Sequence, residues 1–243
     1  MSELRIGTSG WVYESWRGLF YPDELKAKDE LPFFANEFST VEINYTFYKL
    51  PDEEVFSAWR NQVPKEFLFA VKASRFLTHM KKLKDAEEPW ERIIRRAEKL
   101  KNKCGPILLQ FPEKWKKNKE RLEEFFEVVK NSSGKKYKLV FELRNKSWAT
   151  DDIFDLLSKH NAAFCIADSY KFKRFDVVTA DFVYFRFHGM SKSSADYSKQ
   201  RLRKESEIIG GFLEEGLDVY VYFNNDTEGF AIENARTLKQ LLE

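Results

Sequence analysis

Three residues that could carry acid–base chemistry stand at or just beyond the ends of short apolar runs in this chain. They are Glu42, Glu142 and His188. A carboxylate can act as a general base, and a histidine can give or take a proton near neutral pH. Two carboxylates that face each other also suit glycoside hydrolysis, which needs them about 5–9.5 Å apart. These residues are the candidate catalytic set of a hydrolase or lyase.

A second group of polar and aromatic side chains could bind the substrate. Arginine offers bidentate hydrogen bonds to a phosphate or carboxylate, and lysine adds a positive charge. Lys72 could also form a Schiff base, although an ion pair is the favoured interpretation of this residue. The candidate binding residues are Trp11, Asn44, Tyr48, Lys72, Gln110, Arg144, Asp168, Arg186 and Asn224.

The charges in these two groups balance, so ion pairs are expected. Three acidic residues (Glu42, Glu142, Asp168) stand against three basic ones (Lys72, Arg144, Arg186). An isolated buried charge is costly, so such groups pair, and pairing pushes their pKa values apart. A neutral ion-pair network that only fills a barrel interior is the alternative.

No cofactor or resident metal is predicted. The chain has 3 histidines, too few for a histidine-rich zinc cluster, and it lacks a P-loop, a dinucleotide fingerprint and a GxSxG elbow. A single Mg²⁺ or Mn²⁺ on Glu42, Glu142 and Asp168 remains an open alternative. The aromatic stretch after the first strand is either a stacking platform or a hydrophobic cap; it holds Trp11, Tyr13, Trp16, Phe20 and Tyr21.

Eight short runs rich in Val, Ile, Phe and Tyr, beginning about 30 residues apart, predict parallel strands alternating with helices. The predicted strands are Leu4–Thr8, Thr40–Ile43, Phe67–Val71, Ile107–Phe111, Leu139–Leu143, Ala163–Ala167, Phe182–Phe187 and Val219–Phe223. Helices are predicted after Pro51, over Trp90–Leu100 and Lys119–Lys130, over Asp151–Lys159 with Thr150 as N-cap, and over Ala231–Leu242.

The phase of the polar residues favours a closed barrel over an open doubly wound sheet. Along most strands one set of alternate residues is wholly apolar, and the other turns polar at the C-terminal end. In a TIM-type (β/α)8 barrel the apolar set packs on the helices, and the polar ends gather at the C-terminal mouth, where such enzymes bind substrates. We predict one barrel domain over residues 1–243, irregular between strands six and seven because Asp168 to Asp181 is short.

Composition excludes a membrane span and gives no strong charge signal. No run of about 18 apolar residues is present. The formal net charge of +2 neither demands nor excludes nucleic acid. Two widely separated cysteines and the absence of a signal peptide predict a cytoplasmic protein without disulfides.

Several longer motifs resemble the domain-of-unknown-function 72 family, the YecE-like proteins. They run in matching order from about Arg5 to the C-terminus: GTSGW at 7–11, VEIN at 41–44, FAVKA at 69–73, LQFP at 109–112, ELR at 142–144, RFHG at 186–189 and FNND at 223–226. The resemblance implies a TIM-type barrel and no established activity. Three functions stay open: a metal-independent hydrolase or lyase on a small anionic or sugar-like substrate, a nucleic-acid-binding or endonuclease-like protein, and a non-catalytic ligand-binding module.

Overall fold

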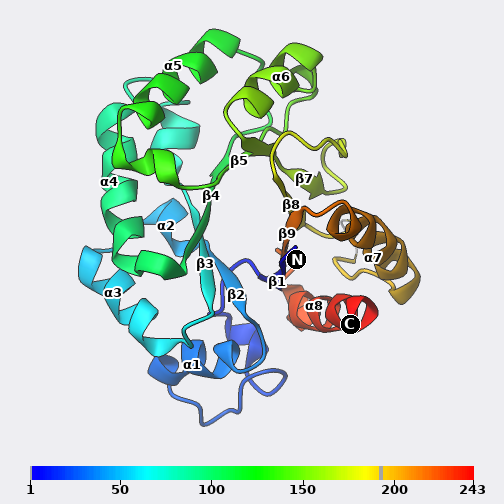
Figure 1. Cartoon of the computed structure of the whole chain (residues 1–243). Helices are drawn as coiled ribbons and strands as arrows, with labels where there is room; N and C mark the ends of the chain where they lie inside the picture. Colours follow the sequence, from blue (N-terminus) through cyan, green and yellow to red (C-terminus); the bar gives the residue numbers. More distant parts are fainter. Residues whose placement is uncertain (1, 192–193) are drawn as a thin grey trace.

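The computed structural model describes residues 2–191 and 194–243 and has a (β/α)8-like arrangement (Figure 1). The strands are β1 (Leu4–Thr8), β2 (Thr40–Ile43), β3 (Leu68–Lys72), β4 (Cys104–Gln110), β5 (Leu139–Glu142), β6 (Ala162–Phe164), β7 (Ile166–Asp168), β8 (Phe182–Phe187) and β9 (Asp218–Phe223). The helices are α1 (Glu30–Ala35), α2 (Tyr45–Tyr48), α3 (Glu53–Gln62), α4 (Glu87–Ala97), α5 (Lys119–Lys130), α6 (Asp151–Lys159), α7 (Lys199–Glu214) and α8 (Phe230–Leu242).

All strand pairs are parallel and form two sheets, ordered β1-β9-β8-β7 and β2-β3-β4-β5-β6. The sheets approach each other at β1 and β2, where Ser9 bridges to Glu42 and the Gly10 N–H donates to the Glu42 carbonyl at 2.8 Å. At the other end only Cys165 separates β6 from β7, so these two short strands continue one another along the chain. The predicted sixth strand is therefore interrupted at Cys165.

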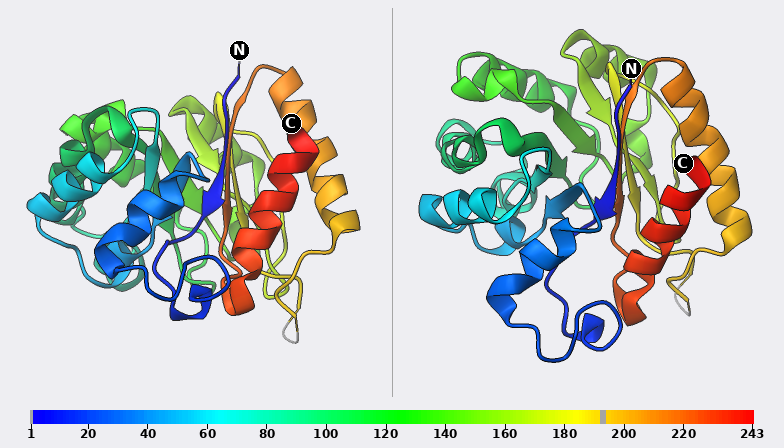
Figure 2. Two further views of the ribbon diagram at one scale, coloured as in Figure 1. Left: turned by 90° about the horizontal axis from the view of Figure 1, so that it is seen from below. Right: turned by 60° about the horizontal axis from the view of Figure 1, so that its bottom comes forward.

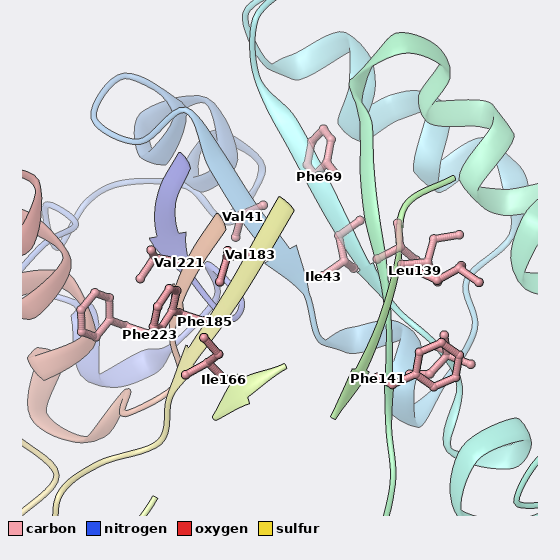
Figure 3. Packing of buried hydrophobic residues seen from close by; sticks show 14 of the residues in the cluster. Val41, Ile43, Phe69, Leu139, Phe141, Ile166, Val183, Phe185, Val221 and Phe223 are labelled. Atoms are coloured by element: carbon pink, nitrogen blue, oxygen red, sulfur yellow. The ribbon is translucent and has the colours of Figure 1, made fainter. Parts of the chain in front are cut away.

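The alternation predicted from the sequence is present in the packing. One set of strand residues, including Val41, Phe141 and Phe185, belongs to the large core between the strands and the helices (Figure 3). The other set forms a second cluster inside the barrel, with Ala70, Val140 and Tyr184 among its members. The helices lie outside the strands in both views of Figure 2, on the side of the outward-facing apolar residues.

All five predicted helices are present, but the short helices α1 and α2 were not predicted, and three further differences appear. A 16-residue helix, α7, was not predicted; only Leu202, Glu205 and Ile209 of it are buried, and Gly210 and Gly211 interrupt its apolar pattern. Helix α4 ends at Ala97 and continues as a 3-10 segment rather than reaching Leu100. Helix α6 begins after Thr150, but the Thr150 side chain does not cap it.

The predicted irregularity between strands six and seven is confirmed. Between Asp168 and Phe182 the described chain contains no helix, and it crosses from β7 to β8 as turns and irregular backbone. This crossover carries Phe172 and Arg174 over the C-terminal ends of the strands. It therefore forms part of the wall around the barrel mouth.

Candidate functional site

The mouth cluster is the set of polar side chains at the C-terminal ends of the strands that face the barrel interior. Five of them stand two residues beyond a residue of the interior cluster, and Arg144 and His188 continue the same alternation, which explains why strand phase predicts them. The mouth cluster comprises Glu42 on β2, Lys72 on β3, Gln110 on β4, Glu142 on β5, Arg144 beyond β5, Arg186 on β8, His188 beyond β8 and Asn224 beyond β9.

Arg186 is the centre of the mouth cluster and joins its two carboxylates. Its Nε and Nη2 donate to Glu42 at 3.0 and 2.7 Å, and its Nη1 donates to Glu142 at 2.5 Å. The side chains of Arg186 and Glu42 are fully buried. Because one guanidinium lies between the two carboxylates, they cannot flank a glycosidic bond. The geometry therefore speaks against using Glu42 and Glu142 as a glycosidase pair.

Glu42 has both carboxylate oxygens occupied by protein donors. Besides Arg186, Oε1 accepts from the Ser9 hydroxyl at 2.8 Å and Oε2 accepts from the Tyr184 hydroxyl at 2.7 Å. Burial would raise the pKa of Glu42, but Arg186 and Lys72 outweigh it and hold the pKa below its usual value. These contacts suit a residue that positions Arg186. Neither Ser9 nor Tyr184 is among the site residues predicted from the sequence, although Tyr184 faces the barrel interior on the same strand as Arg186.

Glu142 differs from Glu42 because two of its partners, Arg144 and His188, line a polar cavity. Its Oε1 accepts from Arg144 Nε at 2.6 Å and lies 3.4 Å from His188 Nε2. Burial opposes ionisation, yet Arg144 and Arg186 hold the pKa of Glu142 well below its usual value. Arg144 keeps 24% of its side chain exposed. Glu142 is therefore a carboxylate held by one buried arginine and one accessible arginine.

His188 belongs to a hydrogen-bond chain that sets its tautomer. Asn44 Nδ2 donates to Asn224 Oδ1 at 3.3 Å, which leaves the Asn224 amide N–H to donate to His188 Nδ1 at 3.0 Å. With this orientation of the Asn224 amide the ring proton is placed on Nε2, which lies 3.4 Å from Glu142 Oε1 and also 3.4 Å from Arg186 Nη1. Burial lowers the pKa of His188 to about 4, so the ring is neutral at pH 7. It offers an N–H donor rather than an imidazolium.

His79 is a further mouth residue that sequence reasoning did not select. It lies in a π-helical turn, Phe76–Met80, and its Nε2 is 3.3 Å from Gln110 Nε2 while its Nδ1 is 3.0 Å from the Thr78 hydroxyl. Burial lowers the pKa of His79 to about 4. Gln110 thus lies in the mouth as predicted and connects β4 to this turn.

The structure places Asp168 away from the mouth cluster, contrary to the expectation from the sequence. Cys165 and Ala167 face the barrel interior, so the next residue points outward towards α7. There Asp168 pairs with Arg174 at 3.2 Å and with Arg201 at 2.6 Å, and both arginines also bind Glu205. The three carboxylates of the open metal alternative are therefore divided between two clusters. In the described part of the chain, no group of three or more His, Cys, Asp or Glu is arranged to hold a metal.

The mouth cluster borders a polar cavity of about 500 Å³. Arg144, His188 and Asn224 form its floor, and Lys171, Phe172 and Glu228 belong to its walls. Phe172 packs under the Arg144 guanidinium, whose Cζ lies 5.0 Å from the ring centroid. The cavity is large enough for a small substrate, and its described charged lining is two basic residues against one acidic residue.

Trp11 and Tyr48 line a different cavity, also of about 500 Å³, together with Trp59 and Asn44. Trp11 packs edge-on against Trp59 with ring centroids 5.3 Å apart, and Tyr48 is 79% exposed. Asn44 lines this apolar cavity and Asn224 lines the polar one, and the two side chains are joined by a hydrogen bond. Trp16, Phe20 and Tyr21 are buried in the core, so they act as a hydrophobic cap.

Comparison with known proteins identifies the family. The model for "Protein of unknown function DUF72" matches residues 5–243. The chain belongs to the DUF72 family. A DUF72 family crystal structure from Thermotoga maritima superposes with a TM-score of 0.82 at 29% identity, covering 99% of both chains. The UPF0759 protein YunF of Bacillus subtilis is 22% identical over 276 aligned positions, covering 99% of this chain and 95% of YunF.

Two further relatives agree with this assignment. The UPF0759 protein YecE of Escherichia coli is 29% identical over 109 residues, which are 45% of this chain and 38% of YecE. A DUF72 family structure from Enterococcus faecalis has a TM-score of 0.82 at 22% identity, covering 98% of this chain and 95% of that one. The family resemblance of the sequence motifs is thus confirmed. No helix within the described residues is long and apolar enough to cross a membrane.

Because the pKa values of His79 and His188 are lowered in the fold, we expect the free energy of unfolding to fall in mildly acidic solution. An unfolded histidine titrates near pH 6.5, whereas His79 and His188 titrate near 4 in the fold. The unfolded chain therefore binds more protons between pH 6.5 and 4, and the free energy of unfolding decreases as the pH falls through that window. Urea denaturation at pH 7.5 and pH 5 measures this. His188→Gln should reduce the difference, and a difference unchanged in that variant would contradict the assignment.

Proposed function

We propose that this protein is an enzyme, a hydrolase or lyase, acting on a small anionic or sugar-like substrate at the C-terminal mouth. One observation supports the proposal: Arg144 and His188, the two residues that contact the buried Glu142 carboxylate, also line a polar cavity. A network that served only to fill the barrel would have no reason to leave Arg144 facing this space. Barrel enzymes bind their substrates at this end of the strands.

Arg144 gives the site a way to activate Glu142 when the substrate arrives. In the free protein the Arg144 Nε donates to Glu142 Oε1 at 2.6 Å. A phosphate or carboxylate that binds Arg144 shares that positive charge and weakens its hold on Glu142. The pKa of Glu142 then rises towards the range useful for proton transfer. The neutral His188 keeps its Nε2–H directed at the same oxygen and orients the carboxylate.

The binding step is tested by thermal shift with sugar phosphates, free sugars and a single-stranded oligonucleotide. At 100 times its dissociation constant a ligand stabilises by about 2.7 kcal/mol. We expect sugar phosphates to raise the melting temperature, and we expect Arg144→Gln to weaken their binding at least about tenfold, the loss of one charge-assisted contact. Lys146→Gln is the matched control because Lys146 is exposed, close in sequence and outside the cavity lining.

The outcomes separate the candidate functions. A sugar-phosphate shift that Arg144→Gln removes and Lys146→Gln keeps supports the proposal. A shift with the oligonucleotide alone would instead favour the nucleic-acid alternative, for which exposed Arg75, Lys116 and Lys171 in the loops beyond β3, β4 and β7 are the supporting observation. Equal sugar-phosphate shifts in the wild type and in Arg144→Gln would contradict the binding role of Arg144.

A further inference from the structure

Lys72 is a buried lysine whose ammonium lacks the partner that burial requires. The residue is 8% exposed at the inward-facing end of β3. No carboxylate oxygen of the described residues lies within the 4.0 Å of its Nζ that defines an ion pair. Its Nζ lies over the Phe47 ring, 4.4 Å from the ring centroid. The ion pair expected from the sequence is therefore not formed, because Arg186 takes both nearby carboxylates.

From this geometry we propose that Lys72 is a catalytic nucleophile that forms an imine with an aldehyde or ketone carrying a phosphate or carboxylate. This deepens the proposed function and rests on it, since Arg144 supplies the anion contact. It also favours a lyase over a hydrolase. Lys72 lies near two arginines and an aromatic ring, and the two carboxylates in the mouth are bound by Arg186 rather than by its ammonium. This arrangement suits an amine better than an ion-pair donor.

The local electrostatics supply the neutral amine that the reaction needs. Burial, followed by repulsion from Arg186, lowers the pKa of Lys72 to about 7, against attraction from Glu42 and Glu142. Arg144 adds to the repulsion. A large fraction of the side chain is therefore uncharged at neutral pH, whereas an exposed lysine is almost wholly protonated.

The covalent step balances without a further reagent. The Nζ lone pair forms a C–N bond with the carbonyl carbon while the C=O π bond breaks and a proton passes from nitrogen to oxygen. The resulting carbinolamine takes up a proton and loses water to give the iminium. The iminium then accepts the electron pair of a neighbouring bond and becomes an enamine: either a C–H bond gives up its proton, or a C–C bond breaks and the departing fragment leaves as an aldehyde while its hydroxyl proton is lost. Protonation of the enamine carbon restores an iminium, and water hydrolyses it to the carbonyl product and the free amine. Glu142 is the carboxylate available to accept the proton.

Reductive trapping tests this proposal. The protein is incubated with dihydroxyacetone phosphate and cyanoborohydride, and the labelled lysine is located by peptide mass spectrometry. We expect Lys72 to be the main labelled position, with at least tenfold less label from uncharged dihydroxyacetone at the same concentration. Lys72→Met should lose the label while keeping the wild-type circular dichroism. Lys116→Met is the control, because Lys116 is an exposed lysine.

The result distinguishes this proposal from the function on which it rests. Labelling spread over surface lysines and unchanged in Lys72→Met would overturn the imine proposal. Sugar-phosphate turnover without Lys72 label would overturn it too, and would leave the proposed function standing. Glu142→Gln separates imine formation from turnover, since this variant should keep the label on Lys72 and lose conversion of the substrate.

Discussion

Arg186→Met is expected to lower the free energy of unfolding by about 3–5 kcal/mol, the cost of breaking a buried ion pair from one side. The substitution leaves Glu42 fully buried with only the Ser9 and Tyr184 hydroxyls as donors. Glu142 keeps Arg144 and His188, so most of the loss arises at Glu42. Urea denaturation at pH 7.5 measures the effect, with Arg203→Met as the control for removal of an exposed arginine.

The pH dependence of this variant identifies the cause. Without Arg186 the pKa of Glu42 rises, because burial is then opposed only by Lys72 and the hydroxyls. The carboxyl becomes neutral at a higher pH than in the wild type, so the destabilisation should shrink as the pH falls from 7.5 to 5. Adding Glu42→Gln to Arg186→Met should recover part of the loss. A loss below about 1 kcal/mol at pH 7.5 would show that the mouth cluster is not held by Arg186.

Lys72→Met should have the opposite effect and stabilise the protein by about 2–4 kcal/mol at pH 7, given a pKa lowered from 10.5 to about 7. Between these values the unfolded chain binds the proton that the folded chain releases. The wild type therefore gains stability as the pH rises from 7 towards 10.5, and the advantage of methionine should disappear over the same interval. Denaturation curves at pH 7 and pH 10 measure it, with Lys116→Met as the control.

A destabilised Lys72→Met variant would mean that the ammonium has a stabilising partner, which would remove the basis for a free amine at this position. If Lys72→Met is more stable than the wild type and also loses the trapped imine, then Lys72 lowers the stability of the protein in which it occurs. Such a combination is expected of a functional group and not of a residue that fills the barrel.

The sequence allowed us to predict which side chains face the mouth, because strand residues alternate between two faces. Glu42, Lys72, Gln110, Glu142, Arg186 and Asn224 all lie in the mouth because each continues the inward alternation of its strand. Asp168 shows where the same reasoning failed. It was assigned by its position at a strand end, but the inward positions are Ala163, Cys165 and Ala167, so its phase points it outward.

Pairing and environment could not be predicted in this way. Three cations and two carboxylates share the mouth, and distances decide which cation is left without a partner. Arg186 reaches both carboxylates, and its planar guanidinium can serve two acceptors at once, which an ammonium cannot do as well. Lys72 is consequently unpaired. Likewise, the Asn44–Asn224–His188 chain joins residues from separate strands, and only the fold brings them together.

We propose that Glu142 transfers protons in a catalytic site at the mouth, and conversion of a substrate is the measurement that checks this role. Wild-type protein and Glu142→Gln are incubated with a panel of sugar phosphates, and the phosphorus resonances are followed by NMR. We expect the wild type to convert at least one compound and Glu142→Gln to convert it about 10²–10⁴ times more slowly while keeping its fold. Conversion at the same rate by both proteins, or no conversion of a sugar phosphate that binds at Arg144, would contradict it.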